Sequence, residues 1–312
     1  MKNLIIFLTL ISFFSSANAQ EQGCGKVYSY VVFLEKNGNI LSEERSEKFS
    51  YPASLVKMMT LYLTFEAIEN QKLKPETVLT ISQRGEEISA VNKVNTMFLK
   101  EGDKIKVSEA IRAVIVKSFN EAAVTLGEAV AGSEWEFARQ MNKKAQELGM
   151  INSSFYNASG LHAEGQYSTS FDLARLSSAI KKDFPKYYHL FSLKEFSYNG
   201  KNYETHNHVL MDYKGAEGMK TGFTNASGYN LISAAKKNDA RIISVLLGCE
   251  TYQKRDEFTK ELLNKAFEKI SAEANHKNII EVKLTKNFDY AKHQQRRDSY
   301  EEEMHFGMAL FE

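Results

Sequence analysis

Hydrophobic residues follow two different periods along the chain. Residues 26–34 are mostly β-branched or aromatic, which favours a strand, and the Asn37-Gly38 pair after them favours a hairpin turn. After Pro52, apolar residues recur every three or four positions, which predicts a helix. This helical pattern dominates from about residue 60 to residue 195. The chain is therefore expected to begin with a strand pair and to continue into a helical block.

Short apolar runs separated by turns follow the helical block. Three of them, at 219–223, 229–235 and 241–248, predict consecutive antiparallel strands, and 255–272 predicts a closing helix. Strands at both ends of the chain with helices between them indicate an α+β fold. The simplest arrangement is one sheet that both ends build, with the helical block inserted.

The first 19 residues have the pattern of a secretory signal peptide. Lys2 gives a short basic start, residues 4–14 are apolar, and small residues end at Ala19, after which we expect cleavage. The apolar run is too short to span a membrane comfortably. We therefore expect an exported, periplasmic protein in a compartment where disulfides form.

Charge and hydropathy exclude two classes of function. The chain has 40 basic and 39 acidic residues, a balance that argues against a nucleic-acid-binding surface. After the signal peptide, no stretch approaches 18 uninterrupted apolar residues, so we expect no membrane span. The short apolar end, HFGMALFE at 305–312, allows at most a weak peripheral membrane contact.

The candidate chemistry begins with a Ser-x-x-Lys pattern that occurs three times. Only Ser54 stands directly before a strongly apolar helix, where free backbone N–H groups and the helix dipole favour an oxyanion. Lys57 would lie on the same face of that helix, within reach of the serine oxygen. A serine at a helix start is by default a cap, so a catalytic role requires partners. The other two pairs are Ser178–Lys181 and Ser233–Lys236.

Two such partners follow in a fixed order. Ser-Phe-Asn at 118–120 lies at the junction of two predicted helices, and Lys-Thr-Gly at 220–222 lies on a predicted strand. Ser-x-x-Lys, Ser-x-Asn and Lys-Thr-Gly, in this order, are the motifs of penicillin-binding proteins and class A β-lactamases. Each motif is weak alone, but the ordered set indicates acyl transfer through a serine.

Longer stretches around these motifs sharpen the comparison. They are PASLVKMMTLYL at 52–63, MFLKEGD at 97–103, LGM…NASGL at 148–161, EGMKTGFTNASGYNL at 217–231 and VLLG at 245–248. Together they resemble the exported D-alanyl-D-alanine carboxypeptidases, the low-molecular-mass penicillin-binding proteins. The resemblance implies a five-stranded antiparallel sheet flanked by helices, with the active site beside an inserted helical subdomain at about 60–195. It places the whole enzyme domain at 20–272 and leaves 273–312 as a C-terminal extension.

The resemblance also implies the catalytic roles. Ser54 would attack the terminal D-Ala-D-Ala bond of a peptidoglycan stem peptide and release D-alanine. Lys57 would take the serine proton, which requires that burial and the cation of Lys220 lower its pKa. Ser118 would relay a proton to the leaving amine. Neither a metal nor another cofactor is needed, and β-lactams are expected to act as covalent inhibitors.

Further residues are implied to bind the substrate. Asn120 would hydrogen-bond the lysine base or the substrate amide, while Lys220 and Thr221 would face the terminal carboxylate. Gly222 would let the peptide approach the strand edge. The backbone N–H of Phe223, together with that of the nucleophile, would form the oxyanion hole.

Two positions depart from the family pattern. Phe119 stands where relatives carry glycine or another small residue; a ring there could narrow the cleft, and the sequence leaves its effect on substrate breadth open. His206 stands where relatives carry an arginine or histidine that holds the substrate carboxylate, so it is a candidate ligand for that group. The pair His206 and His208 also resembles a zinc site, but a third ligand at suitable spacing is missing, so no metal is expected.

Three alternatives stay beside this interpretation. A D,D-endopeptidase that cuts peptidoglycan cross-links would use the same motifs. A class A-like β-lactamase would add a Glu-x-x-Leu-Asn stretch between Asn120 and Lys220, and the chain has none there. A non-catalytic cell-wall-binding module is disfavoured because all three motifs are intact.

The chain has two cysteines, Cys24 and Cys249, which could form a bridge or remain two thiols. The family topology places the first strand antiparallel to the last, so that the start of one neighbours the end of the other. The resemblance therefore implies a Cys24–Cys249 disulfide, which requires Cα atoms closer than about 7 Å.

Overall fold

The computed structural model describes residues 24–25, 28–91 and 95–277. The predicted signal peptide at 1–19 lies outside the described residues, as does the C-terminal extension beyond residue 277. Within the described residues, every helix is too short or too polar to cross a membrane.

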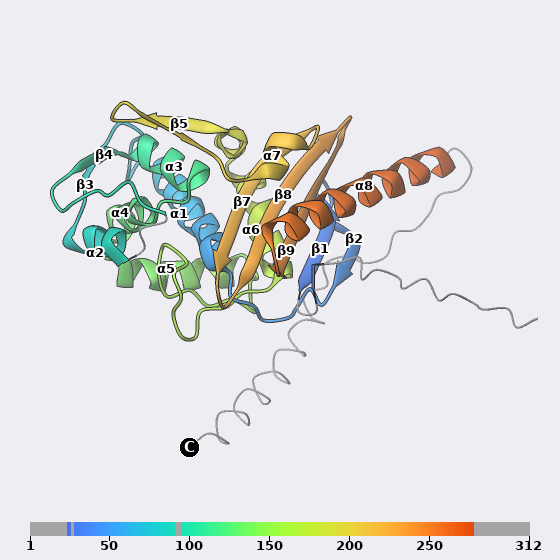
Figure 1. Ribbon diagram of the computed structural model, residues 1–312, viewed down its shortest axis with the longest axis horizontal. Coiled ribbons are helices and arrows are strands. Elements are labelled where there is room, and N and C mark those ends of the chain that lie inside the picture. Colours follow the sequence, from blue (N-terminus) through green and yellow to red (C-terminus); the bar gives the residue numbers. More distant parts are fainter. Residues whose placement is uncertain (1–23, 26–27, 92–94, 278–312) are drawn as a thin grey trace, which may run out of the picture.

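A five-stranded antiparallel sheet forms the centre of the molecule (Figure 1), in the order β2-β1-β9-β8-β7. Both ends of the chain build it, because β1 pairs with β9 from Ser29 opposite Leu247 to Leu34 opposite Ile242. The predicted fold class is therefore confirmed. The strands are β1 (Ser29–Leu34), β2 (Asn39–Glu44), β7 (Ala216–Thr224), β8 (Gly228–Lys237) and β9 (Ala240–Cys249).

Helices cover both faces of the sheet, and most of them form a block beside it (Figure 1). Two short hairpins lie outside the main sheet, β3 (Val78–Thr80) with β4 (Lys104–Lys106) and β5 (Glu195–Tyr198) with β6 (Lys201–Glu204). The α-helices are α1 (Lys57–Glu69), α2 (Gln83–Val91), α3 (Val107–Val116), α4 (Asn120–Ala131), α5 (Glu134–Glu147), α6 (Ser170–Asp183), α7 (His208–Asp212) and α8 (Tyr252–Lys277). The 3₁₀ turns are η1 (Ala53–Val56) and η2 (Tyr188–Ser192).

Neighbouring residues of each strand pack on opposite faces of the sheet, as the pleat requires. Ile242 of β9 belongs to a buried cluster with Leu263 of α8 on one face. The next residue, Ile243, belongs to the main core with Met59 of α1 on the other face. The predicted closing helix is thus α8, which extends at both ends beyond 255–272.

Helix α1 runs through the main core, and its residues from Lys57 to Phe65 are all buried. Such a helix is apolar around its whole circumference because it is surrounded by other elements. Lys57 is the only ionisable amine in that buried stretch, so its charge state depends on the few polar groups that reach it.

A disulfide joins Cys24, just before β1, to Cys249 at the end of β9, with the Cα atoms 4.6 Å apart. The backbone beside it is also bonded, since Glu250 N–H donates to the Cys24 carbonyl at 3.0 Å. The bridge therefore ties the start of the described chain to the last strand of the sheet.

Candidate active site

Ser54 lies in η1, the tight turn that leads into α1, and two glycines allow other backbone segments to approach this turn. A Cβ atom on Gly222 of β7 would lie 3.0 Å from the Pro52 carbonyl oxygen and 3.3 Å from Ser54 N. A Cβ atom on Gly160 would lie only 2.0 Å from the Ala53 carbonyl oxygen. Close packing around the serine therefore requires glycine at 160 and makes a side chain at 222 tight.

The Lys57 side chain is fully buried and its Nζ has three polar neighbours. Nζ lies 3.1 Å from Ser54 Oγ, 2.8 Å from Asn120 Oδ1 and 2.5 Å from the Ser159 carbonyl oxygen. Burial lowers the pKa of Lys57 well below its usual value, and the cation of Lys220 lowers it further. The structure thus favours a neutral amine beside the serine.

The three contacts suit a lysine that acts as a base. A neutral amine has two N–H donors and one lone pair. The Asn120 amide oxygen and the Ser159 carbonyl only accept hydrogen bonds, so they use the two donors. In the neutral amine the lone pair is then left for Ser54 Oγ, 3.1 Å away, whose hydroxyl can donate to it. This arrangement can remove the serine proton as the oxygen attacks.

Lys220 and Thr221 lie on β7 beside this pair. Lys220 is 1% exposed, and its Nζ donates to the Thr221 carbonyl at 2.9 Å. Burial first, and then the charge of Arg255, lower the pKa of Lys220 to about 7. Lys220 therefore changes its charge close to neutral pH.

Ser118 stands between α3 and α4 in a left-handed backbone conformation, with φ +64°. Its hydroxyl is buried and has no hydrogen-bond partner among the described residues. The next turn begins α4, which places Asn120 against Lys57. A buried hydroxyl without a partner is costly unless something else uses it, and here it borders the cavity described next.

A cavity of about 260 Å³ lies against these residues. Lys57, Asn120 and Lys220 are buried behind its wall. The sequence-predicted site residues that line it are Ser54, Ser118, His206, Thr221, Gly222 and Phe223. The structure therefore brings the three motifs and His206 together at one site.

The Phe119 ring points away from the cavity. It is 2% exposed and packs edge-on against Tyr203 of the β5–β6 hairpin, with ring centroids 5.1 Å apart. Phe119 is not among the residues that line the cavity. The sequence left open whether this ring narrows the cleft, and in the structure it does not, because the ring packs in the core.

His206 lines the cavity but carries no charge near neutral pH. Burial, with the cations of Lys220 and Lys117, lowers the pKa of His206 to about 3. It can therefore offer a carboxylate a hydrogen bond and not a positive charge. Its neighbour His208 also lines the cavity, and its Nδ1 lies 2.9 Å from Asp256 Oδ2.

Arg255, which none of the sequence motifs includes, also lines the cavity. Its guanidinium is nearly buried and is held by the adjacent carboxylate, with Nε 2.8 Å from Asp256 Oδ1. An arginine in the first turn of a helix belongs to no motif. Its place at the cavity can be seen only in the fold, where α8 packs against the sheet. Arg255 thus brings a guanidinium, paired with Asp256, to the wall of the cavity.

Aromatic side chains form the outer rim of the cavity. Phe223 is 47% exposed, and its ring stacks on Tyr229 with centroids 4.2 Å apart. Tyr252 of α8 extends this rim and contacts Tyr229 at 6.3 Å. β7 is the last strand in the sheet order, and its Gly222 lies against the turn that carries Ser54.

The antiparallel sheet, the Ser54–Lys57 pair and the Lys-Thr-Gly strand match the motif set of penicillin-binding proteins and class A β-lactamases. Residues 17–251 match the sequence profile of the Peptidase S11 family, described as D-alanyl-D-alanine carboxypeptidase. The chain belongs to this family.

Individual relatives agree with this assignment. D-alanyl-D-alanine carboxypeptidase DacD of Escherichia coli K12 is 35% identical over 240 residues, which cover 75% of this chain and 61% of the relative. Penicillin-binding protein 5 of Haemophilus influenzae has a TM-score of 0.72 and 34% identity, over 75% of this chain and 69% of that one. Penicillin-binding protein D2 of Listeria monocytogenes, solved with ampicillin bound, has a TM-score of 0.68 and 32% identity, over 77% and 96%. The chain spans about three fifths of the length of the curated relative DacD.

Proposed function

We propose that this protein is a serine-type D-alanyl-D-alanine carboxypeptidase that removes the terminal D-alanine from a peptidoglycan stem peptide. The observation that carries the proposal is the buried Lys57 amine. Its two N–H groups are occupied by acceptors, and its lone pair faces Ser54 Oγ at 3.1 Å. Membership of the carboxypeptidase family supports the choice of substrate.

The acylation step uses this pair directly. Ser54 Oγ attacks the carbonyl carbon of the penultimate D-alanine, and its proton passes to Lys57 Nζ. The backbone N–H groups of Ser54 and Phe223 stabilise the oxyanion that forms. The C–N bond then breaks, Ser118 relays a proton to the leaving amine, and free D-alanine departs from an ester on Ser54.

The positive groups of the cavity select a substrate with a free carboxylate. Arg255 and protonated Lys220 supply the charge, while Thr221 and neutral His206 supply hydrogen bonds. A peptide that continues beyond the cleaved bond would place an amide where these cations lie. This preference supports a carboxypeptidase over an endopeptidase.

Water completes the cycle when it attacks the ester, with Lys57 again receiving the proton. β-Lactams acylate Ser54 in the same way, because their strained amide replaces the D-Ala-D-Ala bond. Among the described residues that line the cavity, none is a carboxylate that could activate water. We therefore expect the ester between the β-lactam and Ser54 to be hydrolysed slowly. The drug would then inhibit the enzyme, whereas a β-lactamase would release it rapidly.

Labelling with a fluorescent penicillin and D-alanine release from a pentapeptide ending in D-Ala-D-Ala test the proposal. Both activities should disappear in Ser54→Ala and persist in Ser178→Ala, a matched change in another Ser-x-x-Lys pair. Rapid penicillin turnover without D-alanine release would instead indicate a β-lactamase. Cleavage of cross-linked dimers without D-alanine release would indicate an endopeptidase.

Export to the periplasm is the expected setting for this activity, because the substrate lies outside the cytoplasm. It rests on the signal-peptide pattern at 1–19. Amino-terminal sequencing of the secreted protein should find Gln20 as the first residue.

A further inference from the structure

A second set of polar contacts holds the segment that carries the Ser159 carbonyl. The preceding residue, Ala158, is buried, and both its backbone carbonyl and its backbone N–H are hydrogen-bonded to side chains. Its carbonyl accepts a hydrogen bond from Thr60 Oγ1 of α1 at 2.7 Å, and its N–H donates to Glu134 Oε1 of α5 at 3.1 Å. The acceptor that Lys57 uses is thus positioned by α1 itself and by one carboxylate from α5.

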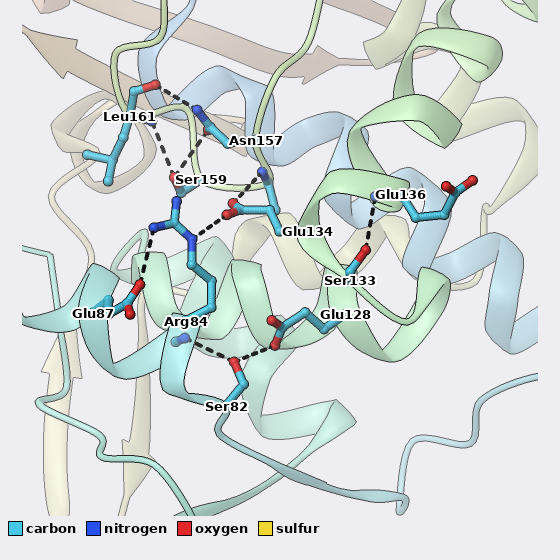
Figure 2. Close-up of polar contacts among 12 residues, drawn as sticks. Ser82, Arg84, Glu87, Glu128, Ser133, Glu134, Glu136, Asn157, Ser159 and Leu161 are labelled. Atoms are coloured by element: carbon cyan, nitrogen blue, oxygen red, sulfur yellow. Dashed lines mark hydrogen bonds and ion pairs between the residues drawn. The ribbon is translucent and has the colours of Figure 1, made fainter.

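That carboxylate has a second partner. Glu134 Oε2 lies 2.8 Å from Arg84 Nε of α2, and the Glu134 side chain is only 9% exposed, against 47% for Arg84. Figure 2 shows Arg84 between Glu134 and Glu87, whose carboxylate is 3.7 Å from the guanidinium. One oxygen of Glu134 therefore serves the ion pair and the other serves the backbone beside Ser159.

A simpler role for Glu134 would be stabilisation of α5. It is the first residue of that helix, directly after the Ser133 cap, where a negative charge interacts well with the helix dipole. An exposed side chain would fulfil that role equally well. Glu136 does so in the same turn, on the other side of the cap in Figure 2, where its side chain is 39% exposed and pairs with Arg139. The burial of Glu134 and its contact with Ala158 are therefore not explained by the helix.

We propose that Glu134, held by Arg84, is a positioning residue for the base Lys57. Its carboxylate fixes the segment whose Ser159 carbonyl occupies one amine donor, and it places a negative charge beside a buried amine. The proposal rests on the proposed function, in which Lys57 accepts the proton of Ser54.

The charges around the amine determine the direction in which the pKa of Lys57 moves when Glu134 or Arg84 is replaced. Lys220 of β7, Glu121 of α4 and Glu134 of α5 are the charged groups that act electrostatically on Lys57. Burial and Lys220 lower the pKa of Lys57, while the two carboxylates raise it. Arg84 and Glu128 are the charged groups that interact with Glu134.

Acylation requires neutral Lys57, so its rate rises with pH through the pKa of this amine. Loss of the Glu134 charge lowers that pKa, and the acid limb of the rate profile moves to lower pH. Loss of the Arg84 charge moves the limb to higher pH. A role limited to stability would change the amount of active protein and leave the limb in place.

The experiment measures the second-order rate of labelling by a fluorescent penicillin against pH in the full chain. In Glu134→Gln, which keeps an oxygen for Ala158 N–H, the acid limb should move by at least about 0.5 pH unit to lower pH. In Arg84→Met it should move the opposite way. Glu136→Gln removes the same charge from the same helical turn and should leave the limb unchanged. An unmoved limb in Glu134→Gln would overturn the electrostatic part of the proposal.

Glu134→Ala tests the positioning part, because it also removes the acceptor for Ala158 N–H. Its plateau rate should fall about tenfold below that of Glu134→Gln, since a small misplacement of a catalytic group is costly. If Glu134→Ala melts at a lower temperature but labels with the wild-type plateau and limb, Glu134 is merely structural. The wild-type protein separates the two proposals: if it labels at Ser54 and releases D-alanine, the proposed function stands whatever the Glu134 variants do.

Discussion

At the scale of single residues, charge near neutral pH decides how the site recognises a carboxylate. The pKa of Lys220 is lowered to about 7, so the cation is present below this pH and lost above it. The KM for a D-Ala-D-Ala pentapeptide should rise roughly three- to tenfold between pH 6 and pH 8.5, as a charge-assisted hydrogen bond is lost. In Lys220→Arg the charge persists, and KM should stay nearly constant over this range. An equal rise in both proteins would show that Lys220 is not the titrating group.

The same lysine also links stability to pH. A lysine whose folded pKa lies below its unfolded value destabilises the fold most where both states are protonated. Raising the pH from 7 towards 9 releases a proton from folded Lys220 but not from the unfolded chain, so the free energy of unfolding should increase. Urea titrations at pH 7 and 9 measure this increase. The increase should be smaller in Lys220→Met, and a fall in stability of the wild-type protein over this range would contradict the low pKa of Lys220.

Phe119 provides a prediction about packing. Its ring is buried against Phe196 and Tyr203 and does not line the cavity. Phe119→Ala should lower the free energy of unfolding by about 3 kcal/mol, the cost of an aromatic ring lost from a core. The relative rates for stem peptides of different size should be unchanged. A broader substrate range in this variant would mean that the ring does control access to the cleft.

At the scale of elements, the site depends on how closely β7 approaches η1. A methyl group at Gly222 would meet the Pro52 carbonyl at 3.0 Å and Ser54 N at 3.3 Å. Gly222→Ala should therefore push the strand away from the serine and slow penicillin labelling by at least about tenfold. Because β7 also pairs with β8 over eight residue pairs, the sheet should remain folded. Labelling rates and melting temperatures measure the two effects, and normal labelling would show that the turn can move aside.

The sequence was sufficient for elements whose signals are local. The three strands after residue 195 and the helix after Pro52 follow from apolar period and turn residues, and their positions agree with β7, β8, β9 and α1. The three motifs could be found because each is contiguous. Arg255 and Glu134 could not, since their importance comes from contacts across the fold with residues far away in the chain. The direction of the Phe119 ring could not be predicted either, because the ring packs against Phe196 and Tyr203, which are far away in the chain.

At the scale of the whole molecule, one covalent bond ties the start of the described chain to the last strand of the sheet. The Cys24–Cys249 disulfide closes a loop with a sequence separation of 225 residues, so it restricts the unfolded chain strongly. Its sulfur atoms lie beside β9 and α8, and neither cysteine lines the active-site cavity. The bond should therefore contribute to stability without contributing to chemistry.

The double variant Cys24→Ser/Cys249→Ser tests this separation. It should lower the free energy of unfolding by about 2–4 kcal/mol, the usual contribution of a disulfide, because the unfolded chain regains its freedom. Urea unfolding at pH 7 measures the loss, with the wild-type protein in a reducing agent as a second route to the same state. At 25 °C the folded variant should label with penicillin at the wild-type rate, since Ser54 and Lys57 are held by α1, β7 and Ser159 and not by the bridge. A slower labelling rate in the fully folded variant would show that the placement of β1 and β9 affects the position of Ser54.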